Sequence, residues 1–180
     1  VALRVVEISE QTPAYHESAF LEEEKRLLER ARSRALQYQV PITLLIRVGR
    51  NAAQAMLETS REQNCDLIML GWKGYTSTVG KILGSVVDDI VNNARTDVML
   101  IKLIGNESLQ KFLLPTAGGA HAQRAEKYIA SFIEFLGGSL TVCSVESSNA
   151  TTDVINKVSE RLSLTVARIT KAYGFDSESK

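Results

Sequence analysis

The chain has 180 residues, and its 21 Lys+Arg balance 21 Asp+Glu, so the formal net charge at neutral pH is zero. That balance argues against nucleic acid as the main partner, because nucleic-acid-binding domains normally carry a basic excess or a basic stripe. With 44% hydrophobic and 23% charged residues, the composition is that of a globular, core-forming protein. The longest apolar runs are far shorter than the roughly 20 residues of a membrane-spanning helix, so we expect no direct membrane insertion.

The cysteines and the N-terminal residues indicate a cytosolic setting. No basic segment followed by an apolar one opens the sequence, as it would in a secretory signal. Cys65 and Cys143 lie far apart with no CxxC pair, and His16 and His121 are the chain's only histidines. We therefore expect no disulfide framework and no structural metal site, as is usual in a reducing compartment.

Short apolar runs alternate with longer segments of helical period along the chain. Strands are predicted at residues 2–8, 42–48, 66–70, 98–103, 112–114 and 140–145. Helices are predicted at residues 17–38, 51–63, 85–94, 120–136 and 151–173, and Asn51 is the expected cap of the second helix. This alternation predicts right-handed crossovers and an α/β fold, with an open parallel sheet that helices cover on both faces. The continuous apolar run at 66–70 predicts a strand that is buried on both faces.

Two distant segments of the chain resemble each other. Residues 2–9 and 139–146 align at an offset of 137 positions, and each precedes a polar linker and a long predicted helix. A repeat of this period suggests two copies of one module. Any two buried strands can look alike, however, so both explanations stay open.

The segment from residue 70 to 85 leaves the carboxyl end of a predicted strand and enters a predicted helix. Ligands bind at this place in open α/β sheets. Gly71 and Gly74 allow positive φ and close approach of the backbone. Gly84 and Ser85 present backbone N–H groups at a helix start, where the helix dipole favours an anion such as phosphate. The pattern predicts a nucleotide-phosphate site.

Charge and spacing refine this prediction. Lys73 and Lys81 lie within the loop and could add positive charge, while the spacing matches neither a Walker loop nor GxGxxG. Structural explanations remain open beside the ligand-binding one. Ser85-x-x-Asp88 is a capping-box pattern, in which the serine only satisfies backbone donors. Trp72 could stack on a base or could pack against the neighbouring loop.

Gly71-x-x-Gly74, then nine residues, then Gly84-Ser85 reproduces the G-2x-G-9x-G-S/T signature of universal stress protein domains. The flanking residues 66–70, 86–91 and 96–102 are also similar to that family. Residues 1–104 resemble one such domain without its first strand, and residues 110–180 resemble the beginning of a second. The strings at 71–74 and 113–119 resemble tandem stress-protein tails of membrane transporters, notably amino-acid permeases and sodium/proton antiporters.

The resemblance implies a flavodoxin-like sheet, ATP or another adenine nucleotide as ligand, which Mg²⁺ can accompany, and a homodimer formed through an edge strand. Carried over by position, with Lys73 as the added charge, the nucleotide-binding residues are Val5, Leu70, Gly71, Lys73, Gly74, Gly84, Ser85 and Val86. Val5 and Leu70 would lie near the adenine. Pro115 and Thr116 belong to the corresponding loop of the second module, which lacks the acidic residue that the family uses there.

The missing first strand is the central strand of the family's sheet. Its absence would expose unpaired strand edges, which is costly. We expect residues 111–116 to fill that place, within the chain as a circular permutant or from a partner chain. The alternative is that the chain is a fragment of tandem domains.

Three functions follow from the sequence. The first is a cytosolic stress-response domain that senses an adenine nucleotide and is tethered to a transporter. The second is a ligand-free dimerisation module of the same fold. The third, a slow ATP hydrolase, is disfavoured because no general base is evident beyond Asp88 and Asp89. No residue is predicted to be catalytic or to bind a metal.

Overall fold

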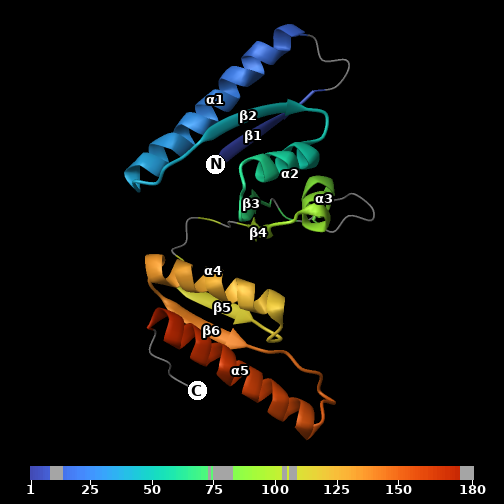
Figure 1. The fold of residues 1–180 in the computed structure, drawn as a ribbon, viewed down its shortest axis with the longest axis vertical. Helices are drawn as coiled ribbons and strands as arrows, with labels where there is room; N and C mark the ends of the chain where they lie inside the picture. Colours follow the sequence, from blue (N-terminus) through green and yellow to red (C-terminus); the bar gives the residue numbers. More distant parts are fainter. Residues whose placement is uncertain (9–13, 73, 75–82, 103–104, 106–108, 175–180) are drawn as a thin grey trace. The chain divides into compact units, whose positions relative to one another are not determined.

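The computed structural model describes residues 1–8, 14–72, 74, 83–102, 105 and 109–174, with only the backbone described at 14–21. The chain divides into two compact units, Val1–Ile104 and Gly105–Lys180, whose elements are labelled in Figure 1. The strands of the first unit are β1 (Ala2–Glu7), β2 (Leu44–Gly49), β3 (Leu67–Gly71) and β4 (Asp97–Ile101). Its helices are α1 (Ala14–Gln37), α2 (Ala52–Glu62) and α3 (Ser85–Asn93).

The second unit contains β5 (Lys111–Pro115), α4 (Ala120–Leu136), β6 (Ser139–Cys143) and α5 (Thr152–Tyr173). All eleven expected elements are therefore present, and the largest shift is the start of α1, at residue 14 instead of 17. The N-cap of α2 is Asn51, as predicted, because its side chain accepts a hydrogen bond from the N–H of Gln54 at 2.9 Å.

The strands pair as three separate two-stranded parallel sheets in the described part of the chain, in the orders β1–β2, β3–β4 and β5–β6. Parallel pairs joined through helices confirm the α/β class that the alternation of elements predicts. The sequence did not reveal that the strands pair only in twos. A parallel strand can pair on both edges, so each sheet keeps further edges that these pairs do not use.

Helices cover both faces of the β1–β2 sheet. Arg4 forms a bidentate ion pair with Glu24 of α1, whereas Glu7 accepts a hydrogen bond from the N–H of Ala52, the first residue of α2, at 2.8 Å. Residues three apart on a strand point to opposite faces. The α1 and α2 helices therefore lie on opposite faces of this sheet.

The core of the first unit lies between α2, α3 and one face of the β3–β4 sheet. Its buried members are Ala53, Leu57 and Ile90, and the partly buried residues packed against them are Met56, Ile68, Leu70, Val86, Ala94 and Val98. The opposite face of β3 is open, since Met69 is 54% exposed. Within the first unit, the described residues therefore do not provide the predicted burial of residues 66–70 on this face. The reason is that a continuous apolar run does not show which elements cover it.

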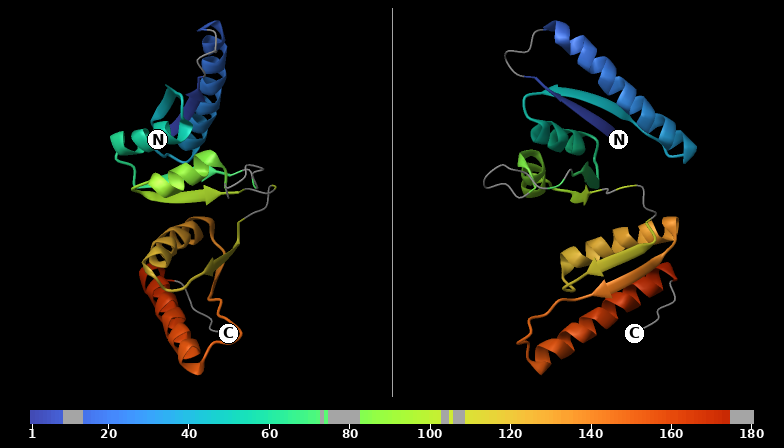
Figure 2. Two further views of the ribbon diagram at one scale, coloured as in Figure 1. Left: turned by 90° about the vertical axis from the view of Figure 1, so that its right-hand side faces the viewer. Right: turned by 180° about the vertical axis from the view of Figure 1, so that it is seen from behind.

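The second unit is a β5–α4–β6–α5 module. Both helices lie side by side on one face of its sheet (Figure 2). Leu114, Ala130, Ile133 and Ile169 are buried there. Leu113 points to the other face and is 64% exposed. Among the described residues, no helix combines the length and the apolar character that crossing a membrane requires.

Candidate functional site

The predicted phosphate loop leaves the carboxyl end of β3. Gly71 is the last residue of β3 and pairs with Ile101 of β4. The Trp72 N–H donates to the Ile101 carbonyl oxygen at 2.8 Å, so the ladder continues for one residue beyond the strand. The loop therefore starts at the edge of the sheet where parallel α/β folds bind ligands.

Gly84 forms an open cradle at the start of α3. It is the N-cap residue, with φ of 111° and ψ of 152°. Among the described residues, and apart from its two chain neighbours, no heavy atom lies within 4 Å of a Cβ built at this position. A residue with a side chain would be strained at this φ and would occupy the open space. The first-turn N–H groups of a helix lack partners in the preceding turn, so an anion can approach them here.

The capping-box explanation for Ser85 is not what the structure shows. Ser85 is the first residue of α3, and the cap position belongs to Gly84. Asp88 instead accepts a hydrogen bond from the N–H of Leu83, with an Oδ1–N distance of 3.2 Å. The exposed Ser85 hydroxyl is therefore not required as the helix cap.

The Trp72 side chain contacts two residues that are distant from it in the sequence. Its Nε1–H donates to the Leu83 carbonyl oxygen at 3.0 Å, and the Lys102 Nζ lies 5.4 Å from the centroid of its ring. The indole is thus hydrogen-bonded to the residue before Gly84. These contacts give Trp72 partners within the chain, and its stacking on a base stays a prediction.

The other predicted nucleotide-binding residues lie in separate places. Val5 is in the middle of β1, where it pairs with Arg47 of β2. Leu70 is in β3, and both its side chain and that of Val86 pack against the core of the first unit. Lys73, like Lys81, lies outside the described residues.

Sequence reasoning missed Lys102, which lies close to Gly74. A Cβ built on Gly74, where φ is 116°, would lie 3.6 Å from the Lys102 Nζ. The two residues are far apart in the chain, but the pairing of Gly71 with Ile101 brings them together. The signal that could have found Lys102 is its position directly after the apolar run of β4.

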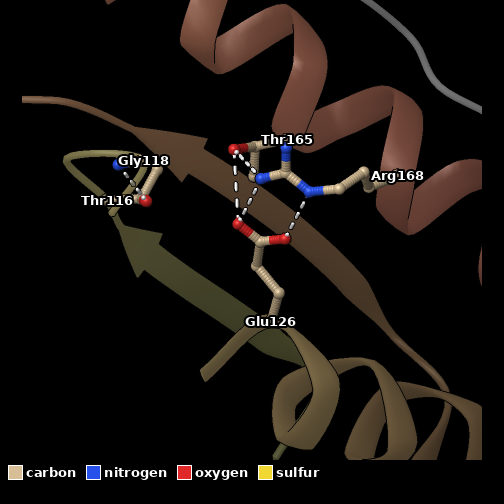
Figure 3. A network of polar contacts seen from close by, with 5 residues as sticks. All are labelled: Thr116, Gly118, Glu126, Thr165 and Arg168. Carbon is tan, nitrogen blue, oxygen red and sulfur yellow. Dashed lines mark hydrogen bonds and ion pairs between the residues drawn. The ribbon is translucent and has the colours of Figure 1, made fainter. Parts of the chain in front are cut away.

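The corresponding loop of the second unit is held by its own hydrogen bonds. Pro115 ends β5. Thr116 is 8% exposed, and its N–H donates to the Cys143 carbonyl oxygen at 2.8 Å. The Thr116 Oγ1 accepts from the N–H of Gly118 at 3.0 Å (Figure 3). The threonine hydroxyl therefore stabilises the turn.

A cavity of about 40 Å³ lies beside this turn. Its lining includes Thr116, Gly118, Ser144, Glu146 and Arg161. The Arg161 side chain covers the turn, because a Cβ on Gly118 would lie 3.3 Å from it. One water molecule takes about 30 Å³ in the liquid, so this cavity is far too small for a nucleotide.

A buried polar network joins the two helices of the second unit (Figure 3). Glu126 of α4 is 6% exposed, and it accepts hydrogen bonds from Arg168 of α5 at 2.8 and 3.1 Å. Thr165, fully buried, donates to the same carboxylate at 3.3 Å. The hydrogen bonds from Arg168 to Glu126 raise the pKa of Arg168 above its usual value. The network therefore holds α4 and α5 together. Both carboxylate oxygens of Glu126 already accept hydrogen bonds from α5.

The family model and the solved structure that this chain matches both belong to universal stress proteins. The model of the universal stress protein family matches residues 1–102. A Na(+)/H(+) antiporter, NhaS5, from Synechocystis sp. is 31% identical over 91 residues, which are 49% of this chain and 13% of the antiporter. The structure of a universal stress protein from Archaeoglobus fulgidus DSM 4304 aligns with a TM-score of 0.63 and 16% identity, over 91% of this chain and 63% of that chain.

The extent of these matches has two consequences. The first unit holds 104 of the 180 residues, so an alignment over 91% of the chain includes residues of both units. The fold likeness therefore extends beyond the part that the family model matches. The chain spans 63% of the length of the Archaeoglobus structure and only 13% of that of the antiporter.

Proposed function

We propose that this chain, which belongs to the universal stress protein family, is a regulatory domain of the stress response that binds ATP or another adenine nucleotide. The observation that carries the proposal is the backbone at Gly84, which combines positive φ, a Cβ direction that meets no described residue beyond its chain neighbours, and the start of α3. Backbone N–H groups at such a position bind phosphate oxygens without any side chain.

The residues present fit a nucleotide phosphate group. Gly71 ends β3, and Gly84 and Ser85 begin α3, so the backbone of both elements meets the same loop. We assign the phosphates to Gly71, Gly74, Gly84, Ser85 and the backbone of Val86. Val5 and Leu70 stay proposed neighbours of the adenine, and Lys73 stays a proposed added charge.

Magnesium would enter this site with the ligand. The described residues contain no group of three or more His, Cys, Asp or Glu side chains that could hold a metal ion. Mg²⁺ at nucleotide sites is commonly held by the phosphates, waters and only one or two carboxylates. We therefore propose that Mg²⁺, where present, is bound mainly by ATP, and that the chain acts by binding and not by catalysis.

The antiporter match supports a tether to a membrane transporter. NhaS5 contains a segment similar to this chain within a much longer protein. We propose that the chain is the cytosolic regulatory part of such a transporter, on the cytosolic side of the membrane. A nucleotide that binds one conformation of the domain more tightly would bias the transporter through the resulting coupling free energy.

The second unit provides strands that could complete the first. We propose that residues 1–104 and 110–180 are two modules of one kind, and that β5 pairs with an unused edge of β3. Because β5 keeps its pairing with β6, the resulting order is β4–β3–β5–β6. The helix in a right-handed β–α–β crossover lies on a face set by the crossover direction. This order would therefore place α3 and α4 on opposite faces and cover both Met69 and Leu113. A homodimer through a remaining edge strand is compatible with this order.

The test of nucleotide binding is calorimetry on the full chain. Wild type is expected to bind ATP with a saturable heat, and Gly84→Asp is expected to abolish it, because a carboxylate would replace the open space and repel phosphate. Gly105→Asp is the matched control, since Gly105 also has positive φ, of 81°, and a Cβ built on it meets no described residue within 4 Å.

The other outcomes separate the competing functions. Phosphate release at a steady rate would favour the hydrolase. A wild-type chain that gives no heat with any adenine nucleotide would reject the sensor and leave the ligand-free dimerisation module, which the absence of an acidic residue at positions 115–119 favours.

A further inference from the structure

The end of β4 brings a lysine to the glycine loop. Lys102 follows β4 directly, and its Nζ lies 5.4 Å from the centroid of the Trp72 ring. The same Nζ lies 3.6 Å from the place that a Cβ on Gly74 would take. The ammonium group therefore contacts the indole face and lies against the Gly74 backbone, where the carboxyl ends of β3 and β4 meet.

Trp72 forms hydrogen bonds through both its backbone and its side chain. Its backbone N–H extends the β3–β4 ladder to Ile101, and its indole N–H reaches the carbonyl oxygen of Leu83 at 3.0 Å. The ring thus connects the end of β3 with the residue that precedes Gly84. Because a cation is attracted to the face of an indole, the ring also restricts where the Lys102 ammonium group lies.

The glycine at position 74 has a steric consequence for the lysine. Any larger side chain there would be in van der Waals contact with the ammonium group. With glycine, no side chain at position 74 separates the ammonium group from an anion bound near Gly74. Glycine at position 74 therefore leaves room for the Lys102 ammonium group and also permits the positive φ.

We propose that Lys102 binds the phosphate groups of the nucleotide and that Trp72 positions it. This inference rests on the proposed function of the β3–α3 loop. A lysine is a compact, strongly hydrated point charge on a flexible stem, which suits contact with phosphate oxygens. Lys102 selects nucleotides by their phosphates, while the adenine and ribose contribute independently of it.

The test is a titration of the full chain with ATP and, separately, with adenosine. Lys102→Met is expected to weaken ATP binding about tenfold, equivalent to about 1.4 kcal/mol, and to leave adenosine binding unchanged. Lys102→Arg keeps the charge and the cation–π contact, so it should restore most of the affinity for ATP. Lys25→Met is the matched control, because it removes one lysine charge from an exposed position of α1.

Trp72 gives a second readout because it is the chain's only tryptophan. ATP should change its fluorescence in wild type, since the phosphates draw the ammonium group from the ring, and adenosine should change it less. In Lys102→Met this difference between the two ligands should disappear.

The possible results distinguish the role of Lys102 from nucleotide binding itself. If wild type and Lys102→Met bind ATP equally, the role of Lys102 is rejected while nucleotide binding stands. Equal weakening of ATP and adenosine by Lys102→Met also rejects it, because that points to damage of the fold. If wild type binds neither ligand, nucleotide binding itself is rejected, and the role of Lys102 is rejected with it.

Discussion

At the scale of single residues, charge pairs show how exposure decides what an interaction contributes. Arg4 and Glu24 join β1 to α1, and their side chains are 44% and 15% exposed. Hydrogen bonding from Arg4 lowers the pKa of the Glu24 carboxyl below its usual value. The Glu126–Arg168 pair also joins two elements, α4 and α5, and its carboxylate side chain is only 7% exposed. Buried charges are more sensitive to the loss of a partner, because solvent cannot replace it.

The Arg4–Glu24 pair should make the stability of the first unit depend on pH. A carboxyl whose pKa is lowered by folding contributes stability above its unfolded pKa, near 4.3 for glutamate, and loses it as the pH falls through the folded value. Arg4→Met should therefore lower the free energy of unfolding by about 0.5–1 kcal/mol at pH 7. The difference from wild type should shrink as the pH falls below about 4. Urea unfolding of wild type and Arg4→Met at several pH values measures this difference in the free energy of unfolding.

The control for this prediction is Arg26→Met, which removes the same charge from an exposed position of α1. Its effect should be smaller at pH 7 and should depend less on pH. A wild-type minus Arg4→Met difference that stays constant from pH 7 to pH 3 would contradict the assignment.

At the scale of elements, the connections carry the most specific sequence requirements. The Gly137-Gly138 pair connects the end of α4 to the start of β6, with φ of 73° and 115°. A Cβ on Gly138 would lie 2.3 Å from the Gln110 carbonyl oxygen, the atom that accepts the Ser139 N–H at 2.9 Å. The close approach of this backbone starts the β5–β6 pairing, so the second glycine is needed for space and for conformation.

Replacing each of these glycines by alanine separates the requirement for space from the requirement for positive φ. Both positions carry the strain of positive φ, which costs roughly 1–3 kcal/mol. Gly138→Ala also forces its Cβ against the Gln110 backbone, whereas Gly137→Ala meets no atom within 4 Å. Gly138→Ala should thus destabilise the second unit by at least about 2 kcal/mol more, as overpacking does. Chemical unfolding followed by circular dichroism gives both values, and equal values would show that the close approach is unimportant.

At the scale of the whole molecule, the central question is what pairs with the unused strand edges. Two-stranded sheets are marginally stable alone, and exposed edges invite further pairing. The open faces at Met69 and Leu113, 54% and 64% exposed, suggest that other elements cover them. The proposed order β4–β3–β5–β6 would bury both.

Hydrogen exchange on the full chain tests that order. If β5 pairs with β3, amides across residues 67–71 should exchange slowly on both edges of the strand, because both rows of N–H groups would be hydrogen-bonded. Pairing within one chain makes this protection independent of protein concentration, whereas pairing between two chains makes it increase with concentration. Protection limited to the amides that face β4 would reject the order. Residues 44–49 provide the internal reference for a strand with one known partner.

Local patterns were sufficient for the elements, and the reason is physical. Helix and strand periods, the Asn51 cap and the stopping glycines act over a few residues, so each element can be located from its own stretch of chain. The glycine spacing likewise located the loop between β3 and α3 and the family to which it belongs. None of this depends on which strand lies beside which.

The tertiary structure decided the contacts that join distant residues. Lys102 meets Gly74 because Gly71 pairs with Ile101, and Glu126 meets Arg168 because α4 and α5 share one face of a sheet. Met69 is exposed because none of the described residues of its own unit covers that face of β3. Pairing register and the covering of faces depend on where other elements lie, and a side chain's own neighbours in the sequence carry no record of that.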